Sequence, residues 1–301
     1  MKNKFLTLTA CFLAMLATTG HAKLNVVATT PDLGAIAQEI GGDKVELVTL
    51  AKATEDPHFV DAKPSFIVKL NHAEVLIDGG AELEVGWLSP LLEGARNPKL
   101  EGGKPGRIYG SDGISLLEIP STLDRSKGDI HAAGNPHYMT DPLNAKIVAE
   151  HIAHAFCQLD PKSCDYFKST LAKFEEHLDA KMVEWQKLLA PYKGKPIVTY
   201  HNYWIYLGKR FDLPMELFLE PKPGIPPTPA HLAEVIQKMK ADNIKVIVVQ
   251  PYQNRKTAET VANHTGAVVA DFNSFPANKQ TYTDWMDGLV HSLVKAFGDK
   301  P

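Results

Sequence analysis

Three histidines stand in unusual local sequences: His58 and His137 each follow a proline, and His201 closes a short β-branched run. Proline fixes its own φ angle and biases the preceding residue toward an extended form, so Pro57 and Pro136 present two imidazoles from stiff loops. Such stiffness suits a metal ligand, which must hold its direction before the metal arrives. A single loop histidine is usually a surface residue, so the prediction of a metal site rests on all three together.

Neutral imidazole is the commonest metal-binding side chain, and zinc prefers four-coordinate sets of nitrogen, sulfur and carboxylate oxygen. The three histidines therefore require a fourth group, for which Asp271 is the best candidate. Asp271 follows the run 266–270, and ligands of open α/β sheets bind beyond the carboxyl ends of the strands. His201 lies at a strand end of the same kind. We expect the four side chains to converge on one divalent metal ion.

Short β-branched, apolar runs alternate with helix-like stretches along the chain. This alternation predicts an α/β fold with mainly parallel sheets flanked by helices. The predicted strands are Leu24–Thr29, Lys44–Leu50, Glu74–Asp78, Pro196–Tyr200, Ile244–Gln250 and Ala267–Ala270. The predicted helices are Asp32–Ile40, Ser65–Asn71, Pro142–Phe156, Trp204–Arg210, Pro229–Ala241, Arg255–Thr265 and Tyr282–Phe297.

The segment Asp165–Ala190 contains no Gly or Pro, and its large apolar residues recur at steps of three and four. The pattern predicts one amphipathic helix, which at about 1.5 Å per residue would be about 40 Å long. Because α/β units lie on both sides of it, we interpret it as a rigid helix that joins two lobes. The predicted organisation is an N-terminal lobe (23–164), a linking helix (165–191) and a C-terminal lobe (192–301), with the metal site in the cleft between the lobes.

The first 22 residues have the layout of a secretory signal: two lysines, a short apolar run and small residues before an expected cut after Ala22. The run is shorter than the roughly 20 residues that cross a bilayer, so we expect no membrane insertion. A second interpretation is a lipoprotein signal that leaves Cys11 to be acylated. Removal of residues 1–22 leaves 30 basic against 35 acidic residues, and such a chain has no electrostatic case for binding nucleic acid.

Two cysteines, Cys157 and Cys164, remain after the expected cleavage. In an oxidising compartment they could pair, because the residues between them read as a helix end, a turn and a helix start. Two free or buried thiols are the alternative.

Several motifs, in their order and spacing, resemble the metal-binding solute receptors of bacterial ABC importers for zinc and manganese. They are Asn25–Ala37, Glu55–Phe59 with Pro64 and Ser65 following, Gly134–Pro142, Tyr200–Trp204 and the strand that ends in Asp271. The resemblance covers essentially the whole mature chain. It implies two lobes joined by a long rigid helix, and it carries the ligand role onto His58, His137, His201 and Asp271. In the manganese branch a glutamate commonly stands at the third position, where this chain has His201.

The resemblance implies a monomeric periplasmic receptor, not an enzyme, that captures Zn²⁺ and delivers it to the membrane permease of an ABC importer. A periplasmic metallochaperone is a second candidate partner. Imidazole suits zinc, whereas carboxylate and water suit manganese, so Zn²⁺ is the expected ion and Mn²⁺ the alternative. Many zinc receptors of the family carry a His-rich loop between the first two ligands, and this chain has none. Other zinc receptors of the family lack the loop as well, so its absence does not decide the metal.

Two interpretations stay open at this stage. His131 is either an auxiliary metal-capturing residue or a solvated loop histidine. A zinc hydrolase or lyase is the alternative function, because three histidines and a water form an open catalytic zinc site. A fourth protein ligand would close that site, and the His-Glu-x-x-His pattern of metalloproteases is absent from the sequence.

Overall fold

The N-terminal half of this computed structural model, which describes residues 22–122, 128 and 131–298, is built on a parallel sheet. Its strands, in spatial order, are β2 (Val45–Thr49), β1 (Leu24–Ala28), β3 (Val75–Asp78) and β4 (Arg107–Tyr109). The expected signal segment, Cys11 included, lies outside the described residues apart from Ala22. Parallel strands are buried on both faces, which explains the β-branched, apolar composition of these segments.

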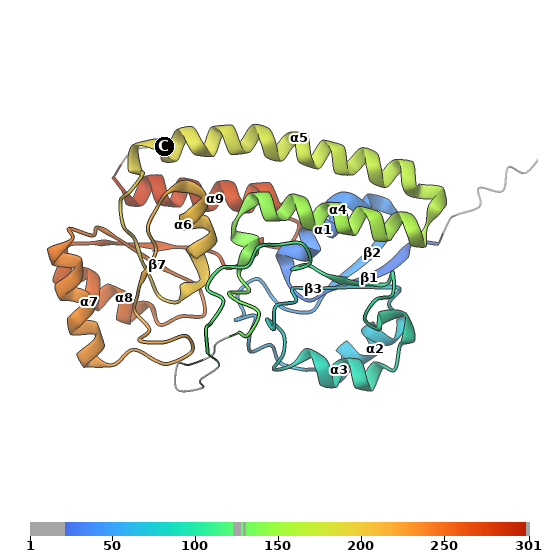
Figure 1. Ribbon diagram of the computed structural model, residues 1–301, viewed down its shortest axis with the longest axis horizontal. Helices are drawn as coiled ribbons and strands as arrows, with labels where there is room; N and C mark the ends of the chain where they lie inside the picture. Colours follow the sequence, from blue (N-terminus) through green and yellow to red (C-terminus); the bar gives the residue numbers. More distant parts are fainter. Residues whose placement is uncertain (1–21, 123–127, 129–130, 299–301) are drawn as a thin grey trace, which may run out of the picture.

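Helices cover both faces of this first sheet. Helix α1 (Pro31–Gly41) packs on one face in a cluster with Val26 and Ala28 of β1. Helices α2 (Pro64–His72) and α3 (Leu88–Ala95) pack against the other face, where Val27 joins their buried leucines. Figure 1 shows α2 and α3 below the strands and α1 above them.

The C-terminal half repeats the plan with a second four-stranded parallel sheet. Its strands, in spatial order, are β6 (Leu217–Phe218), β5 (Val198–Thr199), β7 (Val246–Val249) and β8 (Val268–Asp271). The helices α7 (Pro229–Ala241) and α8 (Arg255–Thr265) pack on one face. The other face carries α6 (Ile205–Phe211) and α9 (Tyr282–Ala296).

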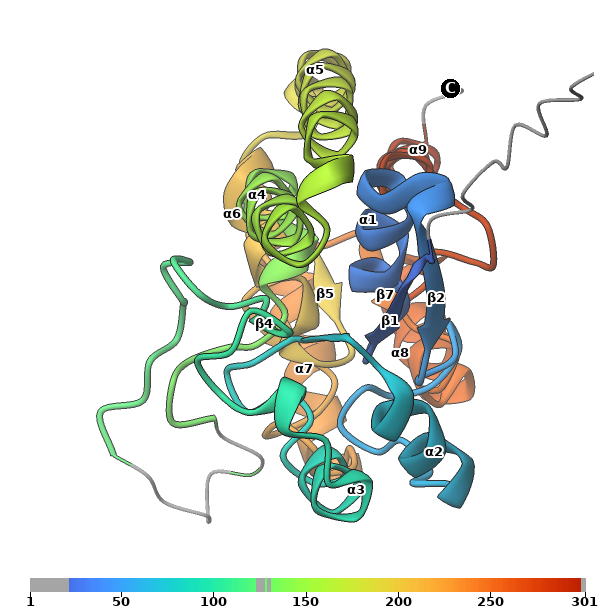
Figure 2. The same cartoon turned by 90° about the vertical axis from the view of Figure 1, so that its right-hand side faces the viewer.

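One long helix, α5 (Cys164–Leu189), runs along both halves, as the sequence predicts (Figure 1). It lies over α4 (Pro142–Leu159), with α1 and α9 beside them (Figure 2). A single cluster of buried apolar side chains runs from the first sheet through these helices to the second sheet. The two halves are therefore joined by a shared hydrophobic core as well as by the chain.

Specific hydrogen bonds add to this shared core. The backbone N–H of Tyr282 in α9 donates to Oε1 of Glu39 in α1 at 3.0 Å, and the Tyr282 hydroxyl donates to the carbonyl oxygen of Met139 at 2.8 Å. In the part of the chain that the structure describes, no helix has both the length and the apolar character that a membrane crossing requires.

Cys157 near the end of α4 and Cys164 at the start of α5 form a disulfide, the first of the two alternatives that the sequence left open. The bridge closes the turn between α4 and α5 and fixes where the long helix begins.

We expect the double substitution Cys157→Ala, Cys164→Ala to lower the free energy of unfolding. The bridged residues are 7 apart in sequence, and closing a loop this short removes unfolded-state entropy worth about 2–3 kcal/mol at 25 °C. Urea denaturation followed by circular dichroism measures the difference. The native protein in excess reductant should approach the variant, whereas a variant as stable as the oxidised protein would contradict the prediction.

Candidate metal site

Loops at the carboxyl ends of the two sheets bring three of the four predicted side chains together. His58 lies in the loop after β2, His137 precedes the short helical turn Tyr138–Thr140, and His201 follows β5. One ring nitrogen of each histidine lies within 4.8 Å of the others. The ring centroids of His58 and His137 are 5.0 Å apart, and those of His137 and His201 are 5.4 Å apart.

Hydrogen bonds hold the two proline-containing loops. The side chain of Asp56 accepts the backbone N–H of His58 at 3.0 Å, and Trp87 Nε1 donates at 2.9 Å to the carbonyl oxygen just before His58. The side chain of Asn135 accepts the backbone N–H of His137 in the same way at 3.0 Å. Such turns, in which an Asp or Asn side chain bonds its own backbone two residues on, fix a loop without regular structure.

Two carboxylates set the orientation of the two partly buried imidazoles, those of His58 and His201. Oδ1 of Asp56 lies 2.9 Å from Nδ1 of His58, and Oε2 of Glu220 lies 2.8 Å from Nδ1 of His201. A carboxylate accepts, so each Nδ1 carries the proton and each Nε2 keeps its lone pair for another partner. Burial alone would raise the pKa of Asp56, but the hydrogen bonds and charge of His58 outweigh it and lower that pKa.

His137 is the most enclosed of the three histidines, with 4% of its surface exposed. Its ring stacks on Tyr203 with centroids 4.0 Å apart, and its Nε2 has no hydrogen-bond partner. Burial lowers the pKa of His137 well below its usual value, and repulsion from His58 and His201 lowers it further. A buried ring nitrogen without a partner costs about 1–3 kcal/mol, and a bound cation would recover that cost.

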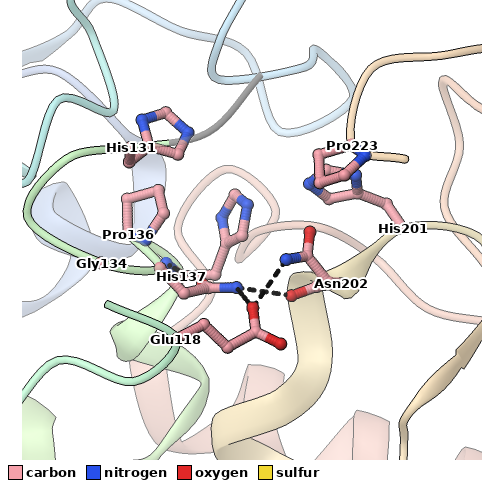
Figure 3. A pocket seen from close by; sticks show the side chains of 9 residues that line it. Glu118, His131, Gly134, Pro136, His137, His201, Asn202 and Pro223 are labelled. Carbon is pink, nitrogen blue, oxygen red and sulfur yellow. Dashed lines mark hydrogen bonds between the residues drawn. The ribbon is translucent and has the colours of Figure 1, made fainter. Parts of the chain in front are cut away.

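Glu118 links the two segments that carry His137 and His201. Its Oε2 accepts from Asn135 Nδ2 at 3.0 Å and from Asn202 Nδ2 at 2.7 Å, and Asn135 Nδ2 also donates to the Asn202 carbonyl oxygen at 2.9 Å (Figure 3). Asn135 stands two residues before His137, and Asn202 directly follows His201. Glu118 itself adopts a left-handed φ of 53°, a conformation that a non-glycine residue holds only where its surroundings impose it.

The structure does not bring Asp271 to the three histidines. Its side chain is 70% exposed and forms an ion pair with Arg255 at the start of α8. In a strand, alternate residues share a face, so Asp271 points to the same side as Val269, which packs against the cluster that contains α7 and α8. The sequence-based expectation located the strand end correctly and missed which face of the edge strand the carboxylate would occupy.

His131 lies beside the cluster rather than in open solvent. Its Nε2 is 3.2 Å from Nε2 of His58. Burial and the nearby rings of His58 and His201 lower the pKa of His131 to about 4. A cavity of about 250 Å³ opens here, lined by His131, His137, His201 and Glu118 among others.

Sequence reasoning missed the roles of Asp56, Glu220 and Glu118. For Asp56 a signal was present, since an Asp two residues before a histidine can form the turn that holds it. Glu220 and Glu118 lie far in sequence from the histidines or asparagines they contact, so no local pattern marks them.

Comparisons with known proteins agree with this fold. The family model described as zinc-uptake complex component A, periplasmic, matches residues 26–296. A metal ABC transporter substrate-binding lipoprotein of Streptococcus cristatus is 26% identical over 269 residues, which are 87% of this chain and 83% of that protein. A manganese ABC transporter substrate-binding lipoprotein of Streptococcus pneumoniae is 25% identical over 282 residues, 92% of this chain and 85% of its own.

Solved structures share the architecture. A zinc-bound ZnuA deletion mutant has a TM-score of 0.78 at 23% identity. The match covers 93% of this chain and 100% of the mutant's chain. A manganese-bound periplasmic metal-binding protein of Candidatus Liberibacter asiaticus has a TM-score of 0.74 at 22% identity, with coverage of 91% and 98%. This likeness confirms the predicted pair of parallel sheets flanked by helices and spanned by a long helix.

We expect His58 and His201 to carry their proton on Nδ1 at neutral pH, because Asp56 and Glu220 accept from that atom. Two-bond ¹⁵N–¹H correlation spectra of the metal-stripped protein identify the tautomer. Asp56→Ala should remove the preference at His58 alone, and Glu220→Ala should remove it at His201 alone. A proton found on Nε2 of either ring in the native protein would contradict the arrangement.

Proposed function

The chain belongs to the family of zinc-uptake complex component A proteins, and from this premise we propose that it captures one divalent transition metal ion outside the cytoplasm for an ABC importer. The relatives described above are substrate-binding proteins of metal ABC transporters. The metal is therefore cargo, held until the receptor delivers it to a membrane permease.

We propose His58, His137 and His201 as the ligands. The observation that carries this proposal is the meeting of three ring nitrogens within 4.8 Å. Two of the rings are oriented by carboxylates so that Nε2 keeps its lone pair, and the third has a buried Nε2 without a partner. Hydrogen bonds to the far nitrogen of ligand imidazoles are the usual support of metal sites.

Zn²⁺ is the ion that we propose, with Mn²⁺ as the second candidate. An imidazole set suits zinc, whereas manganese favours carboxylate and water oxygen. The two carboxylates at the cluster accept from Nδ1 of His58 and His201, so we treat them as supports of the ligands rather than as ligands. Relatives of this chain include a protein named for manganese, which makes the choice of ion a matter for direct measurement.

Family membership gives the chain a receptor's role and not an enzyme's. A zinc hydrolase would need a metal-bound water beside a free general base. The carboxylates that touch the histidine cluster, Asp56 and Glu220, are engaged with imidazole N–H groups. We further propose a periplasmic location, a monomeric state and delivery to the permease, with a metallochaperone as a second candidate partner.

We expect His58→Ala, His137→Ala and His201→Ala each to weaken zinc binding by about 100-fold or more, since a direct ligand should count for more than the 10- to 100-fold of an outer partner. Asp271→Ala is the matched control and should bind like the native protein. Metal analysis of chelator-stripped, reloaded protein and competition with a zinc-binding dye measure stoichiometry and affinity. If Asp271→Ala lost zinc binding, the aspartate would have to be counted among the ligands and the proposed set would be wrong.

Zinc affinity should fall as the pH drops from about 7.5 to about 5.5, because protons compete with the ion for imidazole lone pairs. His137 is already neutral over this range, since its pKa is lowered well below the usual value. It should release no proton on binding, so fewer than three protons should leave per ion although we propose three histidine ligands. Calorimetry in buffers of different ionisation enthalpy counts them; an affinity independent of pH would argue against imidazole ligands.

A further inference from the structure

Three imidazoles leave one corner of a tetrahedral zinc ion to be filled. We propose that His131 supplies the fourth ligand nitrogen, an inference that rests on the proposed role of the other three histidines. The carboxylates of Asp56 and Glu220 already accept from imidazole N–H groups. Asp271 faces α8 and pairs with Arg255 there.

The spacing of His58 and His131 matches that of two ligands on one ion. Their Nε2 atoms are 3.2 Å apart. With Zn–N bonds of about 2.0–2.1 Å and tetrahedral angles, two ligand nitrogens lie about 3.3 Å apart. The ring centroids of His58 and His131 are 5.2 Å apart, close to the 5.0 Å between His58 and His137. His131 thus lies as near to His58 as His137 does, although its ring is stacked on His58 rather than edge-on to it.

The proton positions show how His131 can change partners. Nδ1 of His58 donates to Asp56, so the lone pair of His58 is on Nε2. The 3.2 Å contact then requires Nε2 of His131 to be the donor. When an ion takes the lone pair of His58, that acceptor is lost. The Nε2 proton of His131 exchanges through water to its own Nδ1, which leaves a neutral ring with the Nε2 lone pair available to the ion.

Local contacts hold the backbone around His131 while leaving its ring room to move. Ala132 N donates to Glu82 Oε2 at 2.5 Å, and Gly134 N donates to the His131 carbonyl oxygen at 3.1 Å. His131 is not one of the three histidines whose ring nitrogens lie within 4.8 Å of one another. To bind the same ion, its ring must therefore turn toward His137 and His201. All three rings line the cavity of about 250 Å³ into which it would turn, and Figure 3 shows His131 and His201 on either side of His137.

A fourth imidazole has a consequence for the choice of metal. Four nitrogen donors at tetrahedral corners suit Zn²⁺, while Mn²⁺ prefers oxygen ligands and a larger coordination number. His131 would therefore determine specificity as well as affinity. Replacing this ring by a carboxylate should shift the metal preference from Zn²⁺ toward Mn²⁺, while the fourth coordination position still has a protein ligand.

The test compares His131→Gln with His177→Gln, a matched substitution at an exposed position on α5. The native protein and both variants are stripped of metal and titrated with Zn²⁺ and with Co²⁺. We expect His131→Gln to weaken zinc binding by about tenfold or more, which corresponds to about 1.4 kcal/mol. X-ray absorption of the zinc-loaded protein should count four imidazoles in the native protein and three in His131→Gln, and the visible bands of tetrahedral Co²⁺ should shift only in that variant.

A third variant, His131→Asp, tests specificity, and we expect its ratio of zinc to manganese affinity to fall below that of the native protein. His131→Gln that matches His177→Gln in affinity and imidazole count would overturn the proposal while leaving a three-histidine receptor intact. A native protein that binds no stoichiometric metal would instead overturn the proposed function. Circular dichroism melting of each variant shows that the fold is retained.

Discussion

The site depends on one electrostatic constraint: closely spaced imidazoles repel one another when they are protonated. One nitrogen of each of the three rings lies within 4.8 Å of the other two, and at that distance protonation of one ring opposes protonation of the next. The structure keeps His137 neutral through burial, which lowers its pKa well below the usual value. Asp56 and Glu220 place negative charge on the outer side of the other two rings. The inner side is left rich in lone pairs, an environment that favours a cation.

Because the three clustered histidines come from both halves of the chain, their geometry depends on how firmly the halves are joined. The shared apolar cluster around α4, α5 and α9, in the upper part of the view in Figure 1, provides that rigidity. Closer to the site, Glu118 links Asn135 and Asn202, which lie next to clustered histidines of opposite halves. A left-handed, non-glycine residue at this point indicates that the surrounding contacts outweigh a local backbone cost of about 1–3 kcal/mol.

Much of the fold could be predicted from sequence because long periodic segments carry strong signals. The helices Pro229–Ala241 and Arg255–Thr265 have the predicted bounds, and the long helix differs by a residue at each end. The strands β4 and β6 were missed, since two or three residues at a sheet edge leave no detectable alternation. Helix α3 (Leu88–Ala95) was missed as well because it contains Pro90 and Gly94, which usually signal a break.

The site was predictable to the extent that its residues carry local signals. Proline before His58 and His137 and a strand end before His201 are such signals. Asp271 shows the limit of the same reasoning, because the position of a strand end does not reveal which face of an edge strand a side chain occupies. Glu220 and Glu118 contribute through contacts across long sequence separations, and these contacts exist only once the fold has formed.

The two halves are held together more strongly than the loops around the site, and this difference bears on how a bound ion could leave. Separating the two halves would expose the apolar cluster that they share, and each square ångström of apolar surface exposed costs roughly 25 cal/mol. Movement of the loops that carry His58 and His131 would break hydrogen bonds such as those that Asp56 and Glu82 accept from the backbone, each worth about 0.5–1.5 kcal/mol net. Local rearrangement is therefore the cheaper route for exchange of ligands. We therefore expect the shared core to keep the two halves in place while the loops that carry His58 and His131 move as the ion enters and leaves.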